Sequence, residues 1–243
     1  MTTKNNKNTS TIKSSGKKTL TKKQFLPILI NNEISVNIIE KPINQVSISL
    51  NIKNKTTLLE TKTSSLIIYQ FDEIDKFSKQ LWKLPLIEKP VIVLYGKEVR
   101  QGRDVNFFSD DSVGYKYSGK IMNALPLTDE LKTILSMVNN KFNDRFNGIL
   151  VNCYRTGLDC IGAHSDDEKS LGDSGVISLS LGATRKFRIR DKITKKIVLD
   201  FPISHGCLIH MNGEFQKEFT HEIPKEMKIK ESRLSLTFRN HIK

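Results

Sequence analysis

Three residues with the chemistry of metal ligands stand in the C-terminal half of this chain. His164 and Asp166 are two residues apart, and His221 follows 57 residues after His164. Two histidines and one carboxylate form the 2-His-1-carboxylate facial triad, which holds Fe(II) and leaves coordination positions open for other ligands. The pattern therefore indicates a mononuclear iron site in which His164, Asp166 and His221 are the catalytic metal ligands.

Two arginines follow His221 on a segment with the alternation of a strand. From Arg233 to Arg239, apolar residues alternate with Arg, Ser and Thr, a period-2 pattern that places both arginines on one face. A guanidinium matches a carboxylate with two parallel hydrogen bonds, and an unpaired charge is costly to bury. The segment therefore predicts a site for an anionic guest such as a dicarboxylate.

Each of these features has a simpler explanation when it is taken alone. A His-x-Asp pair is common by chance, a surface histidine such as His221 needs no ligand, and a strand with two arginines usually faces solvent. Two histidines and an aspartate also suit zinc, although structural zinc sites usually close with four protein ligands and often use Cys. The specificity lies in the combination and its order.

The combination resembles the AlkB family of Fe(II)/2-oxoglutarate-dependent dioxygenases, and within it the homologues that act on duplex DNA. The family's Asn-x-Tyr-x-x-Gly stretch is matched by Asn152, Tyr154 and Gly157. Its other motifs are matched by His164, Asp166, His221, Arg233, Thr237, Phe238 and Arg239. Ser235 departs from the family pattern, which usually has Asn at this position. The resemblance extends over about residues 65–243.

This resemblance implies a double-stranded β-helix, a jelly-roll type of fold, with Fe(II) as cofactor and 2-oxoglutarate and O₂ as co-substrates. It implies that 2-oxoglutarate is bound by Asn152, Tyr154, Arg233, Thr237 and Arg239. The implied reaction is oxidative demethylation of N-alkylated DNA bases, such as 1-methyladenine and 3-methylcytosine, yielding formaldehyde, succinate and CO₂. The alternatives are an oxygenase acting on RNA or protein, and a non-catalytic nucleic-acid-binding member.

Residues 94–120 resemble the substrate lid of the same family. Tyr115 and Tyr117 match aromatic residues that hold the flipped base, and residues 94–96 lie where duplex-acting homologues carry an apolar wedge in a hairpin. Asp167 and Glu168 directly follow the metal motif, where a carboxylate would favour a cationic methylated base by Coulomb attraction. The implied substrate-binding residues are Leu94, Tyr95, Gly96, Arg103, Tyr115, Tyr117, Asp167 and Glu168.

Charge points to a polyanionic partner. Of the net charge of +13, seven units come from lysines in residues 1–23, which contain no acidic residue, and +6 remains for the rest. An excess of this sign favours a nucleic acid as partner, and the resemblance implies DNA, with the duplex favoured over the single strand. A compositional bias of the genome would produce the same charge without any partner. Residues 1–23 have almost no apolar content and are expected to be a disordered tail, which in a eukaryotic cell would suit nuclear entry.

Cysteine and apolar content bear on the compartment. Three cysteines, an odd and sparse number, argue against a disulfide scaffold and favour a reducing, intracellular setting. Cys153 and Cys160 flank the metal motif and could ligate zinc, but small buried hydrophobes are the better interpretation. No apolar run approaches ~18 residues, and the N-terminus lacks the apolar core of a secretory signal. We expect no membrane partner and a monomer.

The pattern along the chain divides it into residues 1–23, an N-terminal extension at 24–64 without an assigned role, and a dioxygenase domain at 65–243. Apolar residues recur at helical spacing over 72–82 and 128–143, and residues 104–119 are expected to be loop. Strands are predicted at 66–70, 91–95, 148–154, 176–181, 184–190, 196–199, 207–211, 218–221 and 232–239. Helices followed by dense strands predict a mostly β, α+β fold with a helical buttress around the jelly-roll core.

Overall fold

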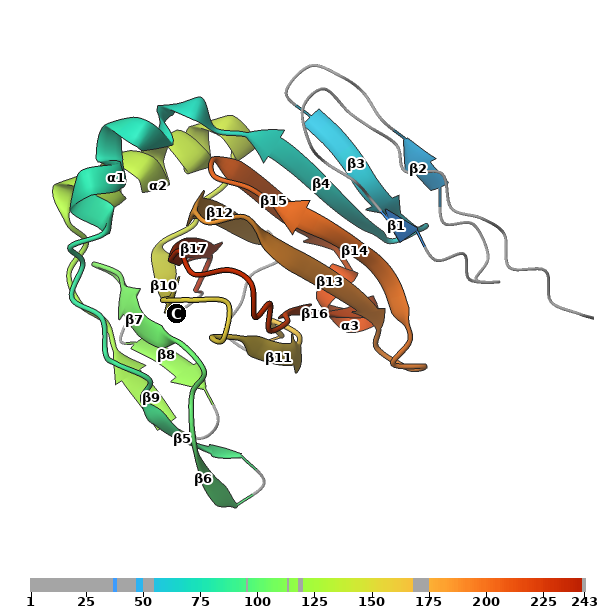
Figure 1. Cartoon of the computed structure of the whole chain (residues 1–243). Helices are drawn as coiled ribbons and strands as arrows, with labels where there is room; N and C mark the ends of the chain where they lie inside the picture. Colours follow the sequence, from blue (N-terminus) through green and yellow to red (C-terminus); the bar gives the residue numbers. More distant parts are fainter. Residues whose placement is uncertain are drawn as a thin grey trace, which may run out of the picture.

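The computed structural model describes residues 37–38, 47–49, 55–94, 96–112, 114–117, 120–167 and 175–241. Two antiparallel sheets face each other across the centre of the molecule, and helices cover the outer side of one of them (Figure 1). The predicted jelly-roll core with a helical buttress is therefore confirmed. The predicted tail at 1–23 lies outside the described residues.

The larger sheet has eight strands. Their order across the sheet is β2 (Ser47–Ser49), β3 (Lys55–Glu60), β4 (Ser64–Gln70), β15 (Cys207–Gly213), β12 (Val176–Gly182), β17 (Arg233–Arg239), β10 (Gly148–Tyr154) and β7 (Asp104–Phe108). Since β3 pairs with β4 over its length, part of the N-terminal extension belongs to this sheet.

The smaller sheet has five strands and carries the two histidines of the metal motif. Its order is β1 (Asn37–Ile38), β14 (Ile197–Ile203), β13 (Arg185–Asp191), β16 (Phe219–Ile223) and β11 (Ile161–His164). Apolar side chains of both sheets meet between them, among them Leu66, Phe187 and Phe201. Alternation along each strand sends these residues inward, so the sheets are held face to face with the site at one end of their interface.

Helices pack on the opposite face of the larger sheet. They are the 3₁₀ turn η1 (Asp72–Ile74), α1 (Asp75–Leu81) and α2 (Asp129–Phe142), while the short α3 (Phe215–Glu218) lies between β15 and β16. Leu131 and Ile134 of α2 pack with Leu236 and Phe238 of β17. The apolar residues of β17 thus face the helices, which leaves its Arg, Ser and Thr side chains to the space between the sheets.

Two small hairpins extend from the open end of the sheets (Figure 1). One pairs β5 (Val91–Leu94) with β6 (Lys97–Arg100), and the other pairs β8 (Gly114–Tyr117) with β9 (Lys120–Asn123). Gly96 has φ +76° in the first turn, a conformation that glycine adopts without steric cost. The hairpin predicted around Gly96 is therefore confirmed, while Tyr95 itself lies outside the described residues.

The expectation of a loop over 104–119 is wrong. Residues 104–108 form β7 and residues 114–117 form β8. All five residues of β7 are buried, although Asp104 and Asn106 are polar. Both polar side chains are satisfied by residues elsewhere in the chain, since Asp104 Oδ2 accepts from Arg155 Nε and the Asn106 amide donates to the Pro85 carbonyl. Two polar residues in a run of five are typical of a loop, and only these contacts allow them to be buried in a strand.

We predict that Thr128→Ala lowers the free energy of unfolding by about 1 kcal/mol, because the Thr128 hydroxyl caps α2 by accepting a hydrogen bond from the Leu131 N–H. Chemical denaturation measures the change. Thr133→Ala is the matched control, since the Thr133 hydroxyl donates only to the Asp129 carbonyl on the exposed face. Equal losses for both variants would contradict the capping role.

Candidate metal and co-substrate site

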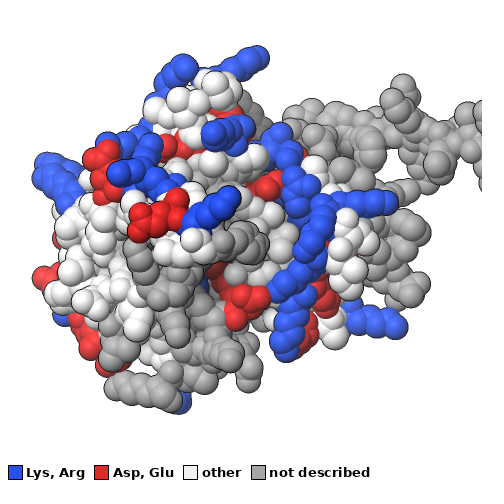
Figure 2. Space-filling view, turned by 90° about the horizontal axis from the view of Figure 1, so that it is seen from below, with Lys and Arg blue, Asp and Glu red and all other residues white. Residues whose placement is uncertain are grey.

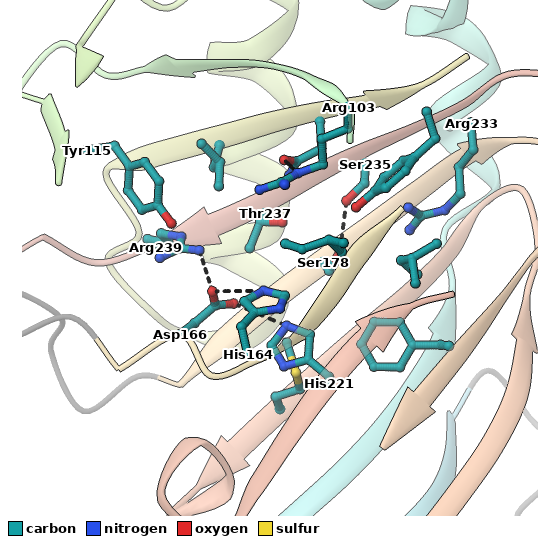
Figure 3. Close-up of a pocket in the computed structure, with 17 residues that line it drawn as sticks. Arg103, Tyr115, His164, Asp166, Ser178, His221, Arg233, Ser235, Thr237 and Arg239 are labelled. Atoms are coloured by element: carbon teal, nitrogen blue, oxygen red, sulfur yellow. Dashed lines mark hydrogen bonds and ion pairs between the residues drawn. The ribbon is translucent and has the colours of Figure 1, made fainter. Parts of the chain in front are cut away.

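The three predicted metal ligands come together at the open end of the two sheets. His164 and His221 are direct cross-strand partners on β11 and β16, and their rings lie 4.3 Å apart between centroids. The Nε2 atoms of His164 and His221 lie 3.8 and 3.6 Å from the Asp166 carboxylate. One ligand atom from each residue falls within 4.8 Å of the others. This geometry suits a single metal ion (Figure 3).

Asp166 reaches the histidines from a loop. A spacing of two residues would place His164 and Asp166 on one face of a strand, but β11 ends at His164, so the alternation of a strand does not position Asp166. Instead its N–H donates to Gln216 Oε1 at 2.9 Å, and the neighbouring Ser165 hydroxyl donates to the Phe219 carbonyl at 2.9 Å. The loop is thus held by α3 and the start of β16.

Both histidines are prepared to bind a metal in the neutral form. The Nδ1 of His164 lies 2.9 Å from the Gly162 carbonyl, which places the proton on Nδ1 and leaves the Nε2 lone pair free. Burial lowers the pKa of His221 to about 3 and also lowers the pKa of His164. Neutral imidazoles are the form that coordinates metal ions.

Asp166 remains ionised in spite of its burial. Burial alone would raise the pKa of this carboxyl, but Arg239 and the two histidines outweigh that effect and hold it well below its usual value. Arg239 Nη2 donates to Asp166 Oδ1 at 2.7 Å. The Arg239 guanidinium also lies over the Tyr115 ring, 4.7 Å from its centroid. Arg239 therefore stabilises the ligand carboxylate directly.

Arg233 lies at the other end of the same pocket, where the side chain is only 1% exposed. Its Nε donates to the Ser180 hydroxyl at 2.9 Å, and its guanidinium lies 5.3 Å from the centre of the Tyr154 ring. Among the described residues its Nη1 is buried without a hydrogen-bond partner. An unpaired donor on a buried cation is costly, so the pocket is built for an anion at this point.

The charge of the pocket fits the groups that the resemblance implies. Among the described residues, Arg103, Arg233 and Arg239 line it together with one carboxylate, that of Asp166. A divalent metal on the triad would raise this excess of positive charge, and a dianionic chelating acid would offset it. The donor set of two imidazoles and one carboxylate suits iron with open coordination positions. Iron on the triad and 2-oxoglutarate reaching to Arg233 therefore fit the residues present.

The other residues predicted to bind 2-oxoglutarate line the same pocket. They are Asn152, Tyr154 and Thr237. Asn152 Oδ1 accepts a hydrogen bond from Arg103 Nε at 2.6 Å, so Arg103 belongs to this pocket rather than to the lid alone. Ser235, which departs from the family pattern, lies 3.3 Å from the Ser178 hydroxyl. Two small hydroxyls thus occupy the place of one larger amide.

Sequence reasoning missed several residues of the site. Ser178 and Ser180 of β12 face β17 with no motif of their own, and Gln216 holds the Asp166 loop from a four-residue helix that is too short to produce a periodic pattern. Phe187 stacks on the His221 ring with centroids 5.4 Å apart and planes at 12°. For two of these residues, Ser178 and Phe187, the alternation of β12 and β13 could have indicated an inward-facing side chain.

The predicted lid residues have different surroundings. Tyr115 is 5% exposed, and its ring packs on Phe107 at 5.9 Å as well as on Arg239. It lines the pocket as a wall that also supports Arg239. The side chains of Leu94 and Tyr117 lie outside the part of the chain that the structure describes.

Asp167 does not face the pocket. Its carboxylate accepts from Lys192 Nζ at 2.8 Å, and the same ammonium donates to the Gln216 carbonyl at 3.0 Å. Lys192 on the turn after β13 thus draws the side chain away from the metal ligands and towards α3. The expectation that Asp167 attracts a cationic base is therefore not supported by its position, and Glu168 lies outside the described residues.

The cysteines take no part in the cluster. In the described part of the chain, the group of side chains placed to hold a metal consists of His164, Asp166 and His221 alone. Burial raises the pKa of the Cys153 thiol to about 11 and that of the Cys207 thiol to about 12, so both remain protonated. Cys153 and Cys160 are partly exposed and Cys207 is buried, so the expectation that Cys153 and Cys160 are small buried residues is met only in part.

Asp166→Ala is expected to weaken Fe(II) binding by at least about 100-fold, since even residues that only support a metal ligand contribute about 10–100-fold. Anaerobic titration with Fe(II) measures the affinity. Asp167→Ala is the matched control, because the neighbouring carboxylate is 58% exposed and pairs with Lys192 instead. Equal affinities for the two variants would remove Asp166 from the metal site.

Comparison with known proteins agrees with this geometry. The chain shares 39% identity over 118 residues with alpha-ketoglutarate-dependent dioxygenase alkB homolog 3 from Homo sapiens, covering 45% of this chain and 41% of the relative. It shares 31% identity over 156 residues with the human DNA oxidative demethylase ALKBH2, covering 61% of this chain and 60% of the relative. The chain thus spans about half the length of these relatives.

A solved structure titled "The structure of OsALKBH1" overlaps 75% of this chain and 99% of its own, with a TM-score of 0.46 and 18% identity. Within the described residues, no helix is long and apolar enough to cross a membrane. The model of the 2OG-Fe(II) oxygenase superfamily matches residues 70–239, a range that contains all three metal ligands and both pocket arginines of β17. The chain belongs to the 2OG-Fe(II) oxygenase superfamily.

Proposed function

We propose that this protein is an Fe(II)/2-oxoglutarate-dependent dioxygenase that oxidatively demethylates N-alkylated bases in DNA. Its substrates would be lesions such as 1-methyladenine and 3-methylcytosine, and its products formaldehyde, succinate, CO₂ and the repaired base. The observation that carries the proposal is the single buried pocket in which the His164–Asp166–His221 cluster and Arg233 lie together. The names of the relatives, which include a DNA oxidative demethylase, supply the substrate class.

In this reaction the residues of the chain bind and orient the metal ion and the co-substrate, and they exclude water. Iron, when bound with 2-oxoglutarate and O₂, would supply the oxidising chemistry that acts on the methyl group. Arg233 would hold the anionic end of the co-substrate, which orients it along β17. Arg239 keeps the Asp166 carboxylate ionised and in place. The apolar residues that pack between the two sheets exclude water from the inner part of the pocket.

The depth of the metal site supports a substrate base that has been flipped out of the DNA duplex. The ligands lie inside the molecule, with Asp166 and His221 each 6% exposed, so a base within a duplex cannot reach them and must be flipped out. The β5–β6 hairpin projects beyond the eight-stranded and five-stranded sheets (Figure 1), and Lys97 and Arg100 on it are exposed. These cations would contact phosphates while the turn at 95–96 approaches the gap left by the base.

The surface charge also supports a nucleic-acid substrate. Figure 2 shows Lys and Arg side chains distributed over the lower face, interspersed with acidic groups. This is the direction in which the β5–β6 hairpin projects in Figure 1. We extend the proposal to duplex DNA as the preferred form, to a monomeric enzyme, and to the nucleus as the compartment, for which the lysines of residues 1–23 would act as an entry signal.

The test is anaerobic reconstitution with Fe(II) and 2-oxoglutarate, followed by O₂ and mass spectrometry of methylated oligonucleotides. We expect loss of the methyl group with formation of formaldehyde and succinate, and no turnover by Asp166→Ala. Parallel arms with single-stranded DNA, duplex DNA and RNA of the same sequence compare the substrates. Turnover of 2-oxoglutarate without demethylation of any DNA would contradict the proposal, and a strong preference for RNA would favour the alternative substrate.

Arg233→Ala should raise the dissociation constant for 2-oxoglutarate by about 30-fold or more, since truncating one partner of a buried charge pair costs about 2–5 kcal/mol. Calorimetry with Mn(II) in place of Fe(II) measures binding without turnover. The dissociation constant of Arg233→Lys should lie between those of the wild type and Arg233→Ala, because lysine keeps the charge but loses the planar guanidinium. The exposed Arg145→Ala is the control. Unchanged affinity in Arg233→Ala would exclude its proposed role.

Tyr95→Ala should reduce activity on methylated duplex DNA far more than on the same single strand. Flipping a base out of a duplex costs roughly a few kcal/mol, which a side chain inserted into the stack helps to offset, whereas a single strand leaves no gap to fill. The ratio of kcat/KM for the two substrates measures the effect. Equal losses on both would mean that Tyr95 is structural, and no loss on either would exclude a wedge.

A further inference from the structure

A second cavity adjoins the metal and co-substrate pocket. It encloses about 170 Å³ between β7 and the two hairpins. Its walls are mainly apolar and include Ile87, Val91, Ile92, Val105, Ile121 and Met122. Arg103 and Tyr115 line both spaces and are seen at the edge of the pocket in Figure 3. Since an apolar cavity of about 150 Å³ can bind benzene, this one has room for one planar ring.

One polar side chain in this cavity lacks a partner. Gln101 is only 7% exposed, and among the described residues its Oε1 is buried without a hydrogen bond. The backbone of Gln101 is satisfied, because its N–H donates to the Pro90 carbonyl at 2.9 Å. A buried carbonyl without a donor costs free energy that a packed apolar residue would avoid. Gln101 lines the cavity, but less than 1 Å² of this oxygen is accessible. A rotation of the amide that turns the oxygen toward the cavity would suit the side chain to a ligand that brings an N–H group.

We propose that Gln101 is a specificity-determining residue that accepts a hydrogen bond from the exocyclic amino group of the target base. The inference rests on the proposed function, which places a flipped base next to the metal pocket. Adenine and cytosine carry an amino group beside the nitrogen that is methylated, whereas thymine carries a carbonyl group on each side of it. An unpaired acceptor in a cavity the size of one ring distinguishes the two classes.

Hydrogen bonding, rather than charge, governs selection in this cavity. No carboxylate is among the described residues that line it, and Arg103 is the one charged group there. The Arg103 Nε already donates to Asn152 at 2.6 Å, and its charge opposes a cationic base. The Asp167 carboxylate pairs with Lys192 instead. The discrimination must therefore come from a neutral acceptor, and Gln101 supplies it.

The experiment compares two single-stranded oligonucleotides that differ in one base, 3-methylcytosine or 3-methylthymine. These bases share the pyrimidine ring and the N3-methyl group, and at C4 one carries an amino group and the other a carbonyl group. They also differ in the 5-methyl group of thymine and in the positive charge of 3-methylcytosine, but these differences are the same for the wild type and the variant and cancel when their ratios are compared. The near-isosteric Gln101→Met removes the acceptor and leaves the charge unchanged. We expect the ratio of kcat/KM for 3-methylcytosine over 3-methylthymine to fall about tenfold in this variant. The Coulomb contribution cancels, because Gln and Met are both neutral.

Gln101→Glu provides the complementary arm. Rotation of the amide could exchange its acceptor for a donor, whereas a carboxylate presents an acceptor in either orientation. This variant should keep or increase the preference for 3-methylcytosine and lose activity on 3-methylthymine. The exposed Gln80→Met on α1 is the matched control for the Met substitution, and thermal unfolding of every variant checks that the fold is kept.

Binding of both oligonucleotides to the iron-free protein, measured by fluorescence anisotropy, separates this inference from the proposed function. A wild-type preference for 3-methylcytosine that disappears in Gln101→Met supports the inference, even if no oligonucleotide is demethylated and the proposed function fails. Equal binding of the two oligonucleotides by the wild type would overturn it. An unchanged preference in Gln101→Met, in binding or in kcat/KM, would overturn it as well.

Discussion

A carboxylate and a guanidinium, both almost fully removed from water, meet at the centre of this site. Asp166 Oδ1 lies 2.7 Å from Arg239 Nη2, and the two residues are 6% and 1% exposed. Neither charge could remain buried alone, because the cost of desolvation is recovered only through the partner and further hydrogen bonds. The pair fixes the Asp166 loop against β17, and so joins the smaller sheet, which carries both histidines, to the larger sheet, which carries the arginines.

Other contacts extend this constraint into the scaffold. Arg185 of β13 is fully buried, with donors to the carbonyls of Thr156, Asp159 and Pro224 and an ion pair to Glu226. It joins the loops that follow β10 and β16. Its guanidinium also lies 5.6 Å from the centre of the Tyr154 ring, the ring that Arg233 approaches. The position of the co-substrate pocket thus depends on a residue that does not line it.

The metal side of the site has a comparable support. The Glu218 carboxylate at the end of α3 accepts a hydrogen bond at 3.1 Å from the hydroxyl of Thr61, in the turn after β3, and one at 2.8 Å from the hydroxyl of Ser64, the first residue of β4. The same helix presents Gln216 to the Asp166 N–H. The larger sheet therefore positions the loop of a metal ligand through one short helix, and His221 follows directly on β16.

The sequence by itself determined the ligand set, the two arginines of β17 and the mostly β fold, because these depend on local spacing and alternation. The His-x-Asp motif and the distant His identify the metal ligands. The period-2 pattern from Arg233 to Arg239 places both arginines on one face of the strand. The fully buried β7 escaped prediction, because its two polar residues, Asp104 and Asn106, are buried only through contacts with Arg155 and Pro85.

Only the tertiary structure decided how these groups act together. It placed Asp166 beyond the end of its strand, drew Asp167 to Lys192 and brought Arg103 to Asn152, 49 residues away. It also left the side-chain oxygen of Gln101 buried without a hydrogen-bond partner among the described residues. Each of these outcomes depends on contacts between segments distant in sequence and on which charged groups are buried away from water. A local pattern of residue types contains no information on either.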